Sequence, residues 1–173
     1  MKPIKVLLAF ASSGVQDKFL ERMKVLRGQI GGLPEVEMLP NLGESIVPAE
    51  AGSNTPNGFA QNMARVRVAD LVVWVHEHDT EDMVMGFMKR CQSCQPILIF
   101  HHHKRNVSQS LVDCLVYYRS QRFASPALDV TEMPDPIRFI SEDDIFKAVA
   151  DWIQKRRELE TARAISNPAP RKK

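Results

Sequence analysis

Five short apolar runs alternate along the chain with segments whose apolar residues recur every three or four positions. Near-continuous apolar runs of this length are typical of strands buried on both faces, as in parallel sheets that helices cover. The five runs are Ile4–Phe10, Val36–Leu39, Ala69–Val75, Pro96–Phe100 and Ile137–Ile140. The alternation predicts an α/β fold: a doubly wound, five-stranded parallel sheet in the flavodoxin-like order 2-1-3-4-5, with helices on both faces.

The segments between the runs carry helix signals. After the first run, apolar residues at helical spacing end at Gly31 and Gly32, which stop a helix. The last helix is expected to begin at Ser141, a capping residue followed by carboxylates that favour the positive helix end. Other helices are expected at 59–66, 83–91 and 108–118. Residues 1–157 are therefore predicted to form one α/β domain, and 158–173 a polar, solvated C-terminal tail.

Composition narrows the class of protein. The chain is long enough for one domain with a core, and its net charge of +2 does not favour a nucleic-acid partner. No stretch approaches the roughly 18 apolar residues of a membrane span, and no targeting signal is visible, so a cytoplasmic protein without membrane contact is expected. Cys91 and Cys94 are interpreted as reduced structural thiols rather than a redox or zinc pair. No cofactor is expected, and a homodimer is left open.

The first loop after a strand is a candidate ligand site. In doubly wound sheets, ligands bind outside the carboxyl ends of the strands where the strand order reverses, here between the first and third strands. Ser12, Ser13 and Gly14 fall in that loop. Small residues let main-chain amides approach a ligand, and the following helix start favours an anion. The same residues also fit an ordinary Ser/Gly turn with a capping residue, and no Gly-Lys-Ser/Thr follows as in a P-loop.

All five histidines follow the third and fourth predicted strands. They are His76, His78, His101, His102 and His103. The first two alternate with Glu77 and Asp79, whereas Lys104 and Arg105 follow the others. Imidazoles beside carboxylates can hold a metal or transfer protons, and imidazoles beside cations can attract phosphate. Exposed loop histidines without a function are the simpler explanation of the pattern. No fixed ligand spacing is present, so no metal site is predicted.

Four short motifs between residues 57 and 115 carry a family resemblance. They are Ala69-Asp70-Leu71-Val72-Val73, Gly86-Phe87-Met88, Gln95-Pro96-Ile97-Leu98-Ile99-Phe100 and Arg105-Asn106-Val107-Ser108. Together this segment resembles the nucleoside 2-deoxyribosyltransferase-like superfamily, especially its 2′-deoxynucleoside 5′-phosphate N-hydrolases. The resemblance implies a nucleotide or nucleoside ligand and cleavage or transfer at an N-glycosidic bond. It also implies that Arg105 and Ser108 bind phosphate, and the Ser12–Gly14 loop is a further candidate from its position in the fold.

The chain departs from this family at its catalytic carboxylates. The position of the family's glutamate, just before the helix glycine, holds Val84, and the position of a second carboxylate holds Asn62. Valine can neither attack nor donate a proton, and an amide is no base, so both losses oppose the family's reaction. Glu81 lies one helical turn before Val84 and, with nearby Asp79, is the candidate carboxylate at the sugar. Asn62 and His78 are then assigned to ligand binding.

A second resemblance leaves another function open. The opening from Ala9 to Phe19, with Ser12 and Asp17, is similar to that of TIR-like domains, which share the same alternation of strands and helices. This resemblance implies a catalytically silent binding or signalling module that acts through protein contacts.

Overall fold

A computed structural model describes most of the two sheet faces and several connecting segments. The described residues are 2–10, 16–41, 58–77, 84, 86–88, 90, 95–104, 109, 112–113, 116–117 and 135–166. Of the candidate site residues, Asn62 lies in these ranges. Ser12, Ser13, Gly14, His78, Asp79, Glu81, Arg105 and Ser108 lie outside them.

The described strands form one five-stranded, all-parallel sheet in the order β2-β1-β3-β4-β5, which confirms the predicted fold class. The strands are β1 (Ile4–Phe10), β2 (Val36–Met38), β3 (Leu71–His76), β4 (Ile97–His102) and β5 (Ile137–Phe139). The helices with full bounds are α1 (Asp17–Gly31), α2 (Gly58–Val68) and α5 (Glu142–Ser166). Residues 84, 86–88, 90, 109, 112–113 and 116–117 are also helical.

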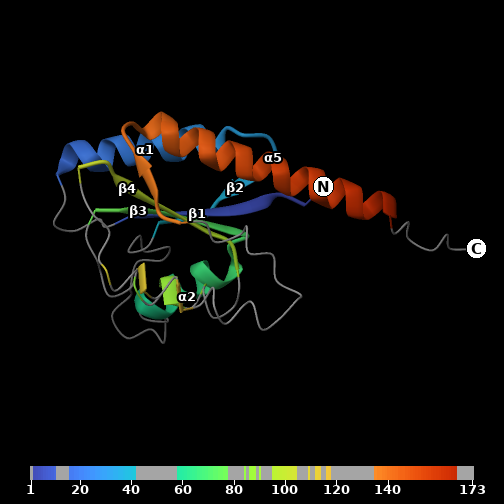
Figure 1. The fold of residues 1–173 in the computed structure, drawn as a ribbon, viewed down its shortest axis with the longest axis horizontal. Helices are drawn as coiled ribbons and strands as arrows, with labels where there is room; N and C mark the ends of the chain where they lie inside the picture. Colours follow the sequence, from blue (N-terminus) through green and yellow to red (C-terminus); the bar gives the residue numbers. More distant parts are fainter. Residues whose placement is uncertain are drawn as a thin grey trace, which may run out of the picture.

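Two hydrophobic clusters cover the two faces of the sheet. Helices α1 and α5 lie together on one face and α2 lies on the other (Figure 1). Successive strand residues point to opposite faces, so each strand contributes to both clusters. The α1/α5 cluster contains Val6, Leu8, Val73, Phe100, Met23, Leu26, Ile145 and Val149. The α2 cluster contains Leu7, Ala9, Val66, Val72, Trp74, Phe87, Ile97 and Ile99.

The predicted core residues of the three central strands are buried, as expected for a sheet covered on both sides. They are Val6, Leu8, Val72, Trp74, Ile97 and Ile99. The strand ends differ from the prediction, because β3 reaches His76 and β4 reaches His102. Three histidines therefore belong to strands and do not follow them.

Helix α1 shows why this sequence folds as it does. Phe19, Met23, Leu26 and Ile30 fall on one face of the helix and are buried. The helix ends at Gly31, where the main-chain N–H of Gly32 donates to the carbonyl of Gly28 at 3.0 Å. These residues bring the chain back to β2 at the amino end of β1.

Helix α5 is longer than the apolar pattern indicates. It was predicted to lie in the domain up to residue 157, yet it continues to Ser166 and extends past the sheet (Figure 1). The described side chains at 158–162 are exposed. Contacts four residues apart support the extension: Gln154 donates to Glu158 at 3.0 Å, and Arg156 pairs with Glu160 at 3.1 Å.

Within the described ranges, no helix combines the length and apolar character that crossing a bilayer requires.

Candidate functional site

The carboxyl ends of β3 and β4 place two imidazoles side by side. His76 and His101 are register partners, and they are only 6% and 5% exposed. By strand alternation both lie on the α2 face, the face of Trp74 and Ile99. The His76 ring meets Trp74 edge-on, with 5.8 Å between ring centroids. The carboxyl ends of β3 and β4 are therefore polar on the α2 face of the sheet, whereas the middle of each strand is apolar on that face.

The next histidine points to the opposite face. The His102 ring packs edge-on against Phe139, at a centroid distance of 5.5 Å, and lies 4.3 Å from the ring of His103. Burial, and then the neighbouring His103, lower the pKa of His102, so its neutral form is favoured. Its Nδ1 accepts a hydrogen bond from the main-chain N–H of Lys104 at 3.3 Å. The histidines are thus divided between the two faces of one sheet edge.

Helix α2 adds a buried polar cluster, which we call the Arg65 cluster (Asn41, Asn62 and Arg65). All three residues are buried. Arg65 Nη1 donates to the Asn41 carbonyl at 2.5 Å and to Asn62 Oδ1 at 3.3 Å. Asn41 follows β2, so the cluster ties α2 to the carboxyl side of that strand. Asn62, which the sequence resemblance aligns with a carboxylate, is therefore a buried amide whose oxygen accepts from a guanidinium.

The opposite, amino edge of the sheet is held by Asp70 and Arg90. The Asp70 carboxylate accepts from the main-chain N–H of Lys5 at 2.8 Å, and the Asp70 N–H donates to the Lys5 carbonyl at 2.8 Å. Arg90 is fully buried and donates to carbonyl oxygens around the starts of β3 and β4, including that of Ala69 at 2.7 Å. Asp70, the aspartate of the family-like strand motif, thus joins β1 to β3 and lies away from the carboxyl edge.

Sequence reasoning missed Asn41 and Arg65 near the candidate site, and it expected Trp74 only as a core residue. The position of Arg65 on its helix could have indicated that it lies beside Asn62. It precedes the core residue Val66 and follows Asn62 by one helical turn. For a metal centre, the described residues contain no group of three or more His, Cys, Asp or Glu side chains that could hold an ion. His78, Asp79 and Glu81 lie outside the described residues.

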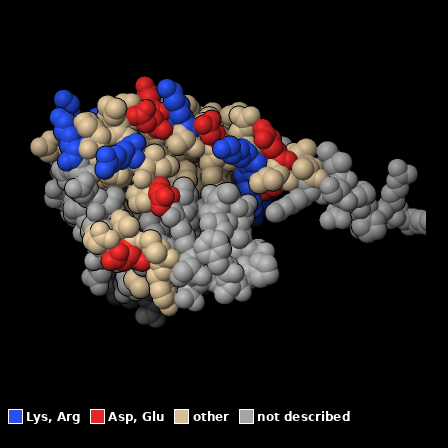
Figure 2. All heavy atoms as spheres, viewed as in Figure 1, with Lys and Arg blue, Asp and Glu red and all other residues tan. Residues whose placement is uncertain are grey.

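A groove of about 330 Å³ lies elsewhere, on the outer side of α1 at the start of α5. It is lined by Lys18, Glu21, Arg22, Val25, Gln29, Glu142 and Asp143. The ion pair of Arg22 Nη1 with Glu142 Oε1, at 3.1 Å, joins the two helices. Figure 2 shows both signs of charge interspersed over this face. The groove therefore has no evident preference for an anion, and the carboxyl edge on the α2 face is the better candidate.

Comparisons with known proteins bear on the fold. No protein-family model and no curated protein matches the chain. A conserved protein from Enterococcus faecalis V583 superposes over 86% of this chain and 98% of its own, with a TM-score of 0.56 and 12% identity. That similarity supports the α/β architecture. The flavoenzyme FerB, an NAD(P)H:(acceptor) oxidoreductase from Paracoccus denitrificans, superposes over 90% of this chain and 98% of its own. Its TM-score is 0.43 and its sequence identity is 12%. The resemblance to deoxyribosyltransferase-like proteins stays a prediction.

Proposed function

We propose that this chain binds a nucleotide or nucleoside at the carboxyl edge of its sheet, as a protein of the deoxyribosyltransferase-like type. The observation that carries the proposal is the register pair of buried imidazoles, His76 and His101, beside the point where the strand order reverses. An imidazole can donate a hydrogen bond to such a ligand or accept one from it, so this edge offers both kinds of partner.

The phosphate of such a ligand has candidate partners in the sequence. Ser12, Ser13 and Gly14 would offer hydroxyls and main-chain amides after β1, and Arg105 with Ser108 would offer a cation and a hydroxyl after β4. These assignments follow the family resemblance and the general preference of phosphate for helix starts and guanidinium groups.

Binding is the core of the proposal, because catalysis needs a carboxylate at the sugar. An N-glycosidic bond breaks through a positively charged sugar, which a carboxylate stabilises or captures. Asn62 is a buried amide bonded to Arg65, so it supplies neither a base nor a nucleophile. Cleavage or transfer would therefore depend on Glu81 or Asp79.

A ligand series measured by calorimetry and thermal shift tests the binding proposal. Deoxynucleoside monophosphates and nucleosides are compared, and a true ligand present at about 100 times its Kd should add about 2.7 kcal/mol to the free energy of unfolding. His76→Gln should weaken binding by at least about tenfold, because it removes an imidazole from the proposed edge. The matched control is His103→Gln, an exposed residue next to His102 on the other face.

The opposite result has a clear meaning. If no nucleotide or nucleoside raises the melting temperature or gives a heat of binding, the nucleotide-binding proposal is wrong. The catalytically silent TIR-like module then becomes the better hypothesis, and the next experiment is a search for protein partners.

A further inference from the structure

One buried donor near the candidate site has no acceptor within the described part of the chain. Trp74 is 1% exposed, and its indole Nε1 has no hydrogen-bond partner among the residues that the structure describes. Buried polar atoms in native proteins nearly always have a partner, so this N–H calls for an acceptor from a water, a ligand or a residue outside the described ranges. Trp74 lies in β3 two residues before His76, on the same face of the sheet.

We propose that the Trp74 N–H recognises the nucleobase of the ligand, donating a hydrogen bond to a ring nitrogen or carbonyl oxygen. This assignment rests on the proposed function, and it specifies which part of the ligand contacts which face of the sheet. The base would lie on the α2 face and not on the face covered by α1 and α5.

The surroundings of Trp74 fit a neutral ring better than a phosphate. Its neighbours in the cluster are apolar, including Ala9, Ile99 and Phe87. An anion there would lose its hydration without a countercharge, whereas a heterocycle offers apolar faces and acceptor atoms. Aromatic side chains are common partners for nucleobases, because every base has a π-face.

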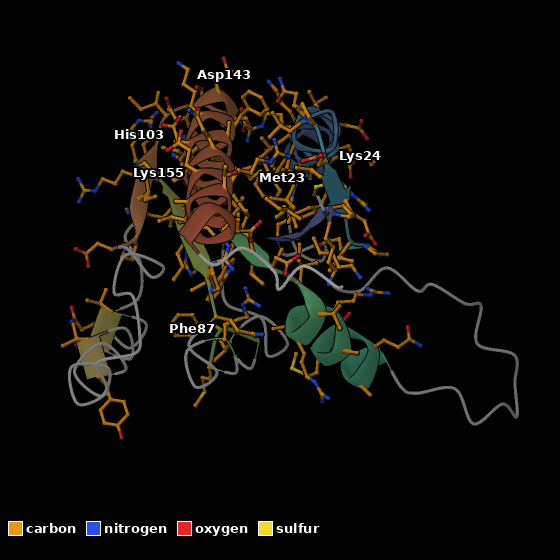
Figure 3. All side chains as sticks on the ribbon, turned by 90° about the vertical axis from the view of Figure 1, so that its right-hand side faces the viewer. Met23, Lys24, Phe87, His103, Asp143 and Lys155 are labelled. Carbon is orange, nitrogen blue, oxygen red and sulfur yellow. The ribbon has the colours of Figure 1, made fainter. Side chains whose placement is uncertain are left out.

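Phe87 is the side chain that must give way. Its ring centroid lies 5.6 Å from that of Trp74, and both rings are buried, so a ligand can reach the indole only if a neighbouring side chain moves. Figure 3 shows Phe87 away from Met23 and Asp143, which belong to α1 and α5. The neighbouring Gly86 packs against Val66 of α2, where an added Cβ would come within 3.2 Å of Cγ2. A base that accepts the hydrogen bond from the Trp74 N–H would therefore displace the Phe87 ring, while Gly86 stays packed against Val66.

The chain offers a matched pair of reporters. It has two tryptophans, Trp74 and Trp152. Trp152 of α5 packs on the α1/α5 cluster, on the other side of the sheet. Trp152→Phe leaves Trp74 as the only indole, and Trp74→Phe leaves Trp152 as the only indole.

The experiment follows the indole signals while ligand is added. With a nucleoside, the Trp152→Phe protein should show a changed emission and a downfield shift of its single ¹⁵N-indole N–H resonance, and the Trp74→Phe protein should show neither. Ribose 5-phosphate, which has no base, should leave Trp74 unchanged in both signals. Trp74→Phe should bind the nucleoside at least tenfold more weakly by calorimetry. The Trp152→Phe measurement keeps Trp74 in place, so it remains decisive if Trp74→Phe does not fold.

The outcomes separate this inference from the proposed function. If the wild type binds nucleosides but the Trp74 signals do not move and Trp74→Phe binds equally well, the N–H belongs to the core or to a buried water and the inference is overturned. If ribose 5-phosphate alone shifts the Trp74 resonance, the phosphate end occupies this face and the assignment of the base is wrong. If the wild type binds no nucleoside or nucleotide by calorimetry, the proposed function fails and the inference fails with it.

Discussion

Replacing Arg90 by methionine removes a buried cation while keeping an unbranched, flexible side chain. The guanidinium is fully buried, and its hydrogen bonds reach the carbonyls of Val66 and Ala69 at 3.2 and 2.7 Å. It also reaches the carbonyls of Asp70 and Pro96, at 3.2 and 2.5 Å from Nη2. One guanidinium thus joins the end of α2 to the starts of β3 and β4. Methionine would leave these buried carbonyl oxygens without their donor.

The magnitude follows from two opposing terms. Hydrogen bonds to a charged group contribute about 1.5–3 kcal/mol each, but the cation itself loses several kcal/mol of hydration when it is buried. Breaking a buried polar assembly from one side usually costs about 3–5 kcal/mol, and we expect that range for Arg90→Met. For a chain of this size, the loss corresponds to a fall in melting temperature of about 10 °C.

Urea unfolding followed by circular dichroism measures the effect. Arg67→Met is the matched control, because Arg67 is exposed on the last turn of α2, and it should change the free energy of unfolding by less than about 0.5 kcal/mol. Arg90→Lys keeps the charge but lacks the planar fork, so it should not restore stability. A loss below about 1 kcal/mol for Arg90→Met would show that the buried guanidinium is not the link between α2 and the sheet, and would refute the reasoning.

Three further predictions address other parts of the chain. Hydrogen bonds from the main-chain N–H groups of Ile140 and Ser141 lower the pKa of Asp144 below its ordinary value of 3.8. The Asp144 contribution to stability is thus present above that value and is lost as pH falls through the lowered pKa, and Asp144→Asn should remove this acid dependence in pH-resolved melting. Glu35 has a positive φ of 55° and a side chain paired with Arg157 at the surface, so Glu35→Gly should raise the free energy of unfolding by about 0.5–1 kcal/mol in urea titrations. If the protein releases base from a deoxynucleotide, Glu81→Gln should abolish release in a chromatographic assay while calorimetry shows retained binding, and an unchanged rate would exclude Glu81 as the catalytic carboxylate.

The sheet could be predicted from the sequence because its strands are buried on both faces. Continuous apolar runs such as Ile4–Phe10 have few alternative interpretations, and the observed β1 has the predicted bounds. The ends of β3 and β4 could not be predicted in the same way. Main-chain pairing continues through His76 and His101 after the side chains become polar, and hydrophobicity carries no signal for that continuation.

The buried cations were invisible to sequence patterns for a related reason. Arginine is rarely fully buried, so Arg65 on an amphipathic helix and Arg90 at a helix end are expected to be solvated. Their burial depends on carbonyls that come from distant segments, such as Asn41 for Arg65 and Pro96 for Arg90. Helix α5 shows the opposite case: its apolar pattern ends at Ile153, and local side-chain pairs continue the helix without a core.

Two residues of the family-like motifs lie at the amino edge of the sheet, where they stabilise the fold. Asp70 and Gln95 belong to the motifs that resemble the deoxyribosyltransferase-like superfamily, yet both serve the amino edge: Asp70 binds the Lys5 N–H, and Gln95 Oε1 accepts from Arg90 at 2.9 Å. Hydrogen bonds of this kind hold the starts of the strands together whether or not the sheet binds a ligand. The strand motifs thus indicate a shared way of building a sheet, and they carry little information about a ligand. The proposed function depends instead on the carboxyl edge, where the buried His76 and His101 are register partners at the ends of β3 and β4. Variants at that edge should therefore change binding more than stability, and variants at the amino edge should do the reverse.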